Sequence, residues 1–207
     1  MARTYRLQVL LRRGEFDLDD AEEESLLKLA HELEDAQVLG PALVAVALAQ
    51  EARGNRERAV ALVEEYGHVT EDRRGFLAQN LTDAVRICVP AGNLAVAERL
   101  LSGVRRAAAR HAASAATCDA VLAEARGELS DAVDLYADAA VRWAGFPSPL
   151  EQGLALLGRG RCLIATGRTG EAKAELEQAR ALFSGLRARP LVSALDDLIA
   201  GTAAVNN

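Results

Sequence analysis

The sequence predicts an all-α protein made of antiparallel helix pairs, and three observations point to this class. A glycine followed five residues later by an alanine recurs four times. Apolar residues return at the helical period after each of these alanines, and no segment of five or more residues alternates as a half-buried strand does. Alanine, the residue with the highest helix propensity, is abundant. We therefore expect helices throughout the chain.

The glycine–alanine repeat divides these helices into pairs. Glycine relieves the left-handed strain at the end of the first helix of a pair, and alanine lets the second helix approach closely. The side chains four and seven residues after the alanine then share one stripe, best developed at Ala132, Tyr136, Ala139 and Trp143. A lone glycine, Gly14, marks a degenerate first pair. The four pairs are Gly54/Ala59, Gly92/Ala97, Gly127/Ala132 and Gly167/Ala172.

Start and stop signals place the helices along the chain. Ser148-Pro149-Leu150-Glu151 reads as a capping box with proline at the first helical position, and Pro41 and Pro190 also suit helix starts. The expected helices lie near residues 3–13, 19–36, 41–53, 56–66, 73–90, 94–111, 113–126, 130–144, 150–166, 170–184 and 190–201.

Short connections between neighbouring helices imply one domain, residues 1–207, in which the pairs stack as a solenoid of about five repeats. The last helix has a single apolar face, at Leu191, Leu195, Leu198 and Ile199, which suits a C-terminal cap. The expected repeats are residues 1–38, 39–70, 71–111, 112–146 and 147–187, followed by a capping helix at 188–203.

The fourth glycine–alanine pair resembles the tetratricopeptide repeat family. The residues that match the family pattern are Gly160, Leu163, Gly167, Ala172, Leu176 and Ala179. The other three pairs fit the same register less completely, with Ala47, Val85 and Ala120 at the small-residue position. The proline that usually closes a repeat is absent, and the spacing of 35–40 residues exceeds the family's 34. The resemblance implies a TPR-like recognition scaffold.

Residues 110–200 also resemble the C-terminal helical repeats of large bacterial multidomain regulators, namely ATPase-type transcriptional activators and proteins with adenylate/guanylate-cyclase domains. The segments that carry this resemblance include LAEARGELSDAVDLYADAAVRW and ALLGRGRCLIATGRTGEAKAELEQARALF. It implies a regulatory or protein-interaction region and transfers no catalytic residue.

Composition and charge exclude several classes of protein. The longest apolar run, Ala42 to Ala49, is far shorter than the roughly 20 residues of a membrane-spanning helix. The chain carries a net charge of −6, and its densest basic patch, Arg105, Arg106 and Arg110, lacks interleaved aromatics, so we expect no membrane and no direct nucleic-acid partner. Residues 15–35 hold ten acids and one lysine, which suits either a solvated helix face or a surface for a basic partner.

The sequence offers no chemistry-bearing motif. Three widely spaced cysteines, Cys88, Cys118 and Cys162, predict reduced thiols that fill apolar space in a cytoplasmic protein. His31, His68 and His111 form no zinc-binding pattern, and neither lysine fits a phosphate-binding P-loop. We expect no cofactor, no metal site and no enzymatic activity.

Function is therefore expected on the concave surface that the first helices of successive pairs would line. Arg86 and Arg161 are the residues best suited to an anionic group, since a guanidinium can hold a carboxylate bidentately. The main hypothesis is a non-catalytic scaffold that binds a protein or peptide, or a second copy of itself through the N-terminal helix. The alternative is an effector-sensing domain that binds a small molecule in this groove and controls attached ATPase, cyclase or DNA-binding domains. The groove residues are Gln79, Thr82, Arg86, Ser114, Thr117, Glu124, Leu157 and Arg161.

Overall fold

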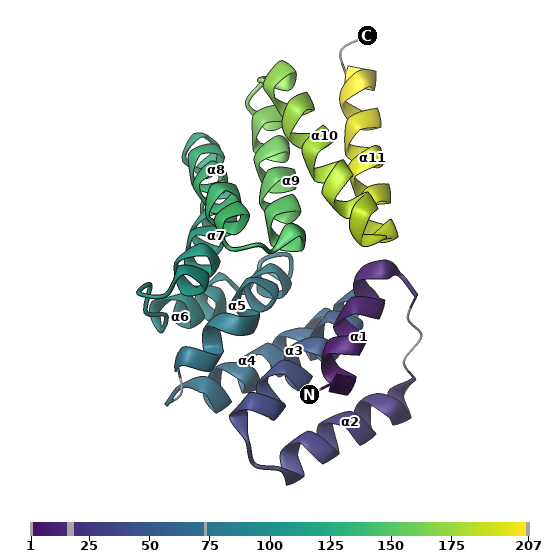
Figure 1. The fold of residues 1–207 in the computed structure, drawn as a ribbon, viewed down its shortest axis with the longest axis vertical. Coiled ribbons are helices and arrows are strands. Elements are labelled where there is room, and N and C mark those ends of the chain that lie inside the picture. The colour runs from purple at the N-terminus through teal and green to yellow at the C-terminus, as the bar shows by residue number, and fades with distance from the viewer. Residues whose placement is uncertain (1, 16–18, 73, 206–207) are drawn as a thin grey trace. The chain divides into compact units, whose positions relative to one another are not determined.

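The protein is all-α in the computed structural model, which describes residues 2–15, 19–72 and 74–205 (Figure 1). Within those residues the chain forms eleven helices and no strand, so the predicted class is confirmed. The helices are α1 (Ala2–Arg13), α2 (Asp20–Glu32), α3 (Ala36–Ala52), α4 (Arg56–Thr70), α5 (Arg74–Cys88), α6 (Leu94–Ser102), α7 (Ala109–Ala125), α8 (Leu129–Gly145), α9 (Pro149–Ala165), α10 (Thr169–Leu186) and α11 (Arg189–Val205).

The helices belong to two compact units. The N-terminal unit comprises residues 1–11 and 15–118, and the C-terminal unit comprises residues 12–14 and 119–207. In the N-terminal unit α3 packs against α2, α4 and α5, and α5 also packs against α4 and α6. In the C-terminal unit α9 packs against α8 and α10, and α11 packs against α10 and α9. Each unit thus builds its own core from helices adjacent in the sequence.

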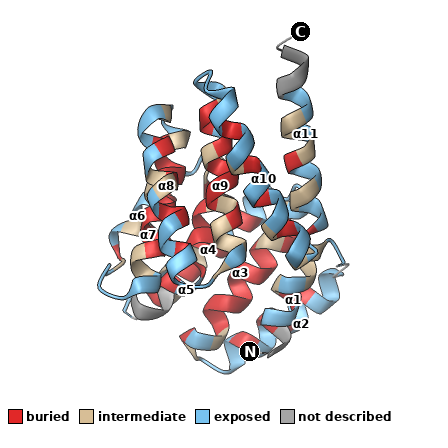
Figure 2. Cartoon of the chain, turned by 45° about the horizontal axis from the view of Figure 1, so that its top comes forward, coloured by how far each residue is buried: buried red, intermediate tan, exposed pale blue. Residues whose placement is uncertain are grey.

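Burial differs between the helices, as Figure 2 shows. Helix α3 is buried on all sides over residues 42–47, none of which is more than 1% exposed. A helix that is apolar all round belongs in a protein core, and α2, α4 and α5 pack against it. In α8 only one stripe is buried: Ala132, Tyr136, Ala139 and Trp143 are at most 2% exposed, as the repeat predicts.

The repeated glycines close five turns of one kind. Gly14, Gly54, Gly92, Gly127 and Gly167 all have positive φ, between 66° and 83°. In each turn the amide after the glycine donates to a carbonyl five residues earlier, for example from Asn55 to Gln50 at 2.9 Å and from Arg168 to Leu163 at 2.8 Å. This is the Schellman motif, in which a left-handed residue ends the helix and satisfies its last carbonyls. The role predicted for these glycines is confirmed.

A sixth turn of this kind lacks glycine. The amide of Ala188 donates to the carbonyl of Phe183 at 2.9 Å, and Arg187 occupies the left-handed position with φ of 58°. A side chain with a Cβ adopts this conformation at a cost, because the Cβ crowds the following carbonyl. The turn between α10 and α11 is therefore strained where its counterparts are not.

The alanines of the repeat lie at helix contacts. Ala59, Ala97, Ala132 and Ala172 are at most 1% exposed. A buried position filled by a single methyl group allows two helix backbones to approach more closely than larger side chains permit. The packing role predicted for these four alanines is confirmed.

The expected helix at 94–111 is wrong at its C-terminal end. Helix α6 stops at Ser102, whose hydroxyl donates to the carbonyl of Arg99 at 2.8 Å, and residues 103–108 are not helical. Gly103, a poor helix former, follows directly. Val104 thus falls outside the apolar stripe of its helix. The basic patch is likewise divided, because Arg105 and Arg106 lie in this loop and Arg110 lies on α7.

Two predicted helix starts also differ. Pro41 lies inside α3, which begins five residues earlier at Ala36. Asp35 caps the helix there by accepting a hydrogen bond from the Gln37 amide at 2.8 Å. Ser148 does precede α9 and Pro149 does open it, yet the Ser148 side chain makes no capping hydrogen bond. The prolines and the caps therefore mark helix starts less reliably than the glycines mark helix ends.

Candidate functional site

Three of the predicted groove residues come together in the C-terminal unit. Glu124 lies in the last turn of α7, and Leu157 and Arg161 lie one turn apart on α9. The Arg161 Nε donates to Glu124 Oε1 at 2.8 Å, and its Nη2 donates to Oε2 at 2.7 Å. This paired geometry is the strongest arrangement of an arginine and a carboxylate. Leu157 is 8% exposed and supplies packing rather than open surface.

A tyrosine completes this cluster. The Tyr136 hydroxyl donates to Glu124 Oε2 at 2.6 Å, so the carboxylate accepts three hydrogen bonds from two side chains. Tyr136 reaches it because the facing residue on α9 is Gly158: a Cβ there would lie 2.4 Å from the Tyr136 ring. The close approach of α8 and α9 thus holds the Tyr136 phenol within hydrogen-bonding distance of the Glu124 carboxylate. The sequence predicted Tyr136 only as a core residue and gave no signal for its polar role.

The electrostatics of the cluster favour its charged form. Burial alone would lower the pKa of Arg161, but the hydrogen bonds and the negative charge of Glu124 outweigh it and raise the pKa above its ordinary value. The Arg161 side chain keeps 45% of its surface exposed. The Arg161 guanidinium is already paired with Glu124. A carboxylate from a partner would therefore have to share the guanidinium with Glu124 or displace Glu124 from it. The predicted anion-binding role of Arg161 stays a prediction.

The remaining groove residues lie in the N-terminal unit, and three of them are buried. Ser114 and Thr117 are at most 1% exposed and donate to the carbonyls of Ala78 and Ala113, at 3.2 and 3.1 Å. Thr82 is 5% exposed. These hydroxyls lie inside the packing of α5 and α7, so they do not offer an open surface. The helical register selected these three residues for the groove, but it could not indicate how closely the helices meet.

Two groove residues of the N-terminal unit reach solvent. Gln79 is exposed, and its backbone carbonyl accepts a hydrogen bond from Arg110 Nη2 at 3.1 Å. Arg86 is half-buried and lies 3.8 Å from Asp83 on the same helix. These two side chains are the accessible polar groups among the predicted residues of this unit.

Burial keeps two thiols and one phenol in their protonated forms. All three cysteines are buried, and none of them forms a disulfide. Burial raises the pKa of Cys88 to about 12 and that of Cys162 to about 11, with Glu64 adding to the first effect and Glu124 to the second. Burial also raises the pKa of Tyr66 far above its ordinary value. These groups are protonated at neutral pH, whereas the reactive form of a cysteine is the thiolate.

The acidic segment is anchored through one buried acid. Glu23 is 4% exposed; its Oε2 accepts from Gln50 Nε2 at 2.5 Å, and its Oε1 lies 3.0 Å from Arg53 Nη1. Asp19 caps α2 by accepting from the Glu22 amide at 2.8 Å. At least these two acids hold α2 in place. The sequence predicted a solvated helix face or a surface for a basic partner at residues 15–35, and neither prediction included this structural role.

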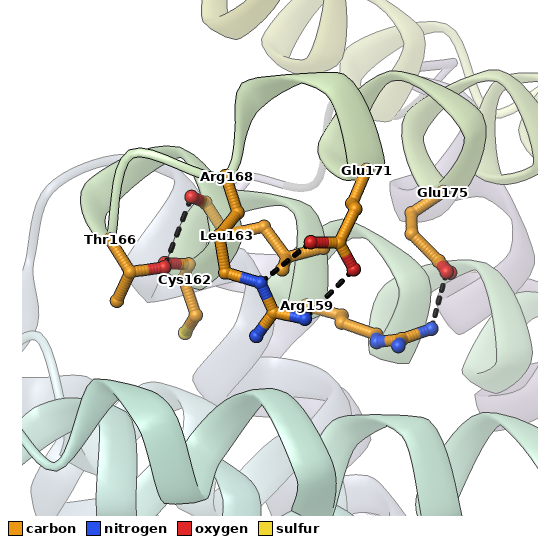
Figure 3. A network of polar contacts seen from close by, with 7 residues as sticks. All are labelled: Arg159, Cys162, Leu163, Thr166, Arg168, Glu171 and Glu175. Carbon is orange, nitrogen blue, oxygen red and sulfur yellow. Dashed lines mark hydrogen bonds and ion pairs between the residues drawn. The ribbon is translucent and has the colours of Figure 1, made fainter.

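Ion pairs also hold α9 to α10 and brace the turn between them (Figure 3). Arg159 on α9 pairs with Glu175 on α10. Arg168 donates from Nε and Nη2 to both oxygens of Glu171, each at 2.8 Å, which lowers the pKa of that carboxyl. The Thr166 hydroxyl donates to the Cys162 carbonyl at 2.9 Å. These contacts are structural, since every group in them points to a neighbour on the same helix pair.

Two clefts lie away from the predicted groove. One, of about 450 Å³, is formed by the end of α10 and the start of α11 in the C-terminal unit. The other, of about 210 Å³, lies in the N-terminal unit between α4 and α6 and is lined by His68, Glu71 and Arg99 among others. Among residues with described side chains, no group of three or more His, Cys, Asp or Glu residues could hold a metal ion. Nor is any helix described here long and apolar enough to cross a membrane.

No known family model matches the chain, and no curated protein matches it significantly. The geometry must therefore carry any functional assignment by itself.

Proposed function

We propose that this chain is a TPR-like helical-repeat scaffold of about five repeats that binds a protein or peptide segment without catalysing a reaction. The observation that carries the proposal is the fivefold recurrence of one helix-ending turn with a left-handed glycine, at Gly14, Gly54, Gly92, Gly127 and Gly167. Repeated helix–turn–helix units that pack on their neighbours in chain order are typical of solenoids, whose extended surfaces recognise other proteins.

The packing order within each unit supports this proposal. In the N-terminal unit α3 contacts its pair partner α4 and also α5, the first helix of the following pair. In the C-terminal unit α9 contacts its pair partner α10 and also α11. Contact of one first helix with the next, as between α3 and α5, is the arrangement that lets first helices form a common binding face. A bundle around one central axis would not require this order.

The non-catalytic part of the proposal has chemical support. Cys88 and Cys162 are protonated at neutral pH, and Glu124, Tyr136 and Arg161 hydrogen-bond to one another. A general base or nucleophile would instead need a reactive group open to substrate. A cytoplasmic location and a bacterial signalling or transcriptional regulator as the parent protein belong to the same proposal.

The experiment compares one variant of the binding face with a matched control. Arg161→Ala removes a cation that is 45% exposed on α9, and Lys173→Ala removes one that is 78% exposed on α10. Partners are captured by cross-linking, identified and purified, and their dissociation constants are measured by calorimetry. We expect Arg161→Ala to weaken binding about tenfold, equivalent to about 1.4 kcal/mol, and Lys173→Ala to leave it unchanged. Equal affinity of both variants for every purified partner would contradict this binding face.

Self-association through α1 is a second form of the same proposal. Tyr5 and Val9, one helical turn apart, are 46% and 48% exposed, and neighbouring exposed apolar side chains form a surface that a second copy of the chain could cover. The pair Tyr5→Ser and Val9→Ser should lower the mass found by light scattering at high concentration. Val141→Ser, at a position 72% exposed on α8, is the control. A wild-type chain that is monomeric at every concentration would exclude self-association.

The effector-sensing alternative requires a small molecule in the same groove. Leu157 and Arg161, the predicted groove residues of α9, are respectively packed and paired with Glu124, and the two clefts described above lie at other helices. We therefore prefer the protein-binding role. Protection of Arg161 from a guanidine-specific reagent by a metabolite would favour the alternative.

A further inference from the structure

The cleft between α10 and α11 contains two arginines without an acidic partner. Arg187 and Arg189 are exposed, and in the part of the chain that the structure describes neither forms an ion pair. Two guanidinium groups at one cleft repel each other unless an anion lies between them. The cleft, of about 450 Å³, is lined by Phe183, Ser184, Arg187, Arg189, Val192, Ser193 and Asp196.

The only acid of this lining does not neutralise the two arginines. Asp196 Oδ1 lies 3.1 Å from Arg180 Nη2, on the neighbouring helix α10. Because Asp196 and Arg180 neutralise each other, the positive charges of Arg187 and Arg189 in the lining are not balanced by Asp196. A positively charged cleft in a chain whose net charge is −6 is a local feature rather than a result of composition.

The backbone of Arg187 gives an independent reason to consider this residue. It takes the left-handed position that glycine occupies in the five equivalent turns. A non-glycine residue held in this conformation costs stability, and such strain clusters at ligand-binding positions. Glycine would remove the strain, but it would also remove one of the two cations of the cleft.

We propose that this cleft binds a phosphate group, either free or carried by a small molecule. A phosphate offers three or four acceptor oxygens, and the two guanidinium groups and the hydroxyls of Ser184 and Ser193 offer enough donors to satisfy them. A carboxylate has only two oxygens and would leave donors unused. Phe183 and Val192 provide an apolar wall for the rest of an organic phosphate. This site goes beyond the proposed protein-binding face and does not depend on it.

The test measures the melting temperature in inorganic phosphate, glycerol phosphate, acetate and chloride at equal ionic strength. In the wild-type chain we expect both phosphates to raise it by about 2–4 °C at about five times the dissociation constant. Arg189→Gln should abolish this rise. Arg187→Gly should also abolish it while melting at a higher temperature than wild type without phosphate. Arg58→Gln, at an exposed position on α4, changes the charge equally and should respond as wild type does.

Each outcome bears on the proposal. An equal rise in all four proteins would identify a general salt effect and overturn it, as would a wild-type chain that does not respond. An equal response to acetate would overturn the choice of phosphate. Calorimetric titration then separates the two sources: tighter binding of glycerol phosphate than of inorganic phosphate identifies an organic phosphate, and equal binding identifies the free ion.

Discussion

Tyr136 lies directly over Gly158, so close that a Cβ at position 158 would be 2.4 Å from the phenol ring. The contact brings α8 against α9 and holds the Tyr136 hydroxyl 2.6 Å from Glu124 Oε2. One glycine thus determines both a helix crossing and the polar cluster on the predicted binding face.

Replacing this glycine should destabilise the protein. Gly158→Ala places a methyl group within the ring's volume, and overpacking of this kind costs about 1–3 kcal/mol, although alanine regains up to about 1 kcal/mol in helix propensity. We expect a lower urea midpoint. Gly185→Ala is the control, because nothing lies within 4 Å of its Cβ on α10; it should be stabilising by up to about 1 kcal/mol. If Gly158→Ala were as stabilising as Gly185→Ala, the ring would move away freely and the overpacking argument would be wrong.

The left-handed turns can be tested without any change in packing. Gly127 has φ of 79°, and a Cβ added there would meet nothing within 4 Å. Gly127→Ala should therefore destabilise by about 1–2 kcal/mol through backbone strain alone. Gly170→Ala, also in open space but inside α10, should not destabilise. Thermal unfolding followed by circular dichroism measures both, and equal stability of the two variants would refute the strain argument.

The alanine of the third repeat pair tests the helix packing. Ala132 is fully buried on α8, whereas Ala144 on the same helix is exposed. Ala132→Leu should overpack the contact and cost about 1–3 kcal/mol, and Ala144→Leu should change the free energy of unfolding by less than about 0.5 kcal/mol. Chemical denaturation distinguishes them. Equal free energies of unfolding for Ala132→Leu and Ala144→Leu would contradict the prediction that the helices pack closely at Ala132.

The buried thiols predict a loss of stability at alkaline pH. The pKa of Cys162 rises from 9.0 in a model thiol to about 11 in the fold, and that of Cys88 rises to about 12. Above about pH 9 the unfolded chain loses these protons while the folded chain keeps them, so the free energy of unfolding should fall as pH rises through this window. Urea midpoints at several pH values measure the fall.

A variant separates the thiols from the tyrosines, which also titrate at alkaline pH. Cys88→Ala with Cys162→Ala should flatten the curve between about pH 9 and pH 11 relative to wild type. An unchanged slope would assign the effect to other groups. Alkylation of the wild-type thiols at about pH 8 should be slow in buffer and fast in urea, because the reagent reaches them only on unfolding.

The features that the sequence could predict are those that depend on local chemistry. A positive φ favours glycine, so Gly54, Gly92, Gly127 and Gly167 could be assigned to turns from the sequence. A close helix contact favours a small residue, so the burial of Ala132 could be predicted as well. The early end of α6 at Ser102 was missed because the apolar pattern continued through Leu101 and Val104. Here the low helix propensity of Gly103 outweighed the pattern.

The candidate site was predicted less well than the fold. The helical register assigned Ser114 and Thr117 to the binding face, but both are buried. Their burial depends on how closely α5 and α7 pack, and the spacing of residues along the sequence does not determine that distance. The pairing of Arg161 with Glu124 joins residues 37 positions apart, and nothing in the sequence selects that partner for the arginine. Arg187 gave no signal at all, since arginine is the residue least expected at a glycine position.

Because each Schellman turn is closed by hydrogen bonds among its own six residues, a helix pair can form its bend before the rest of the chain has folded. Nucleation is then available at several points along the chain, before any contact between residues distant in the sequence has formed.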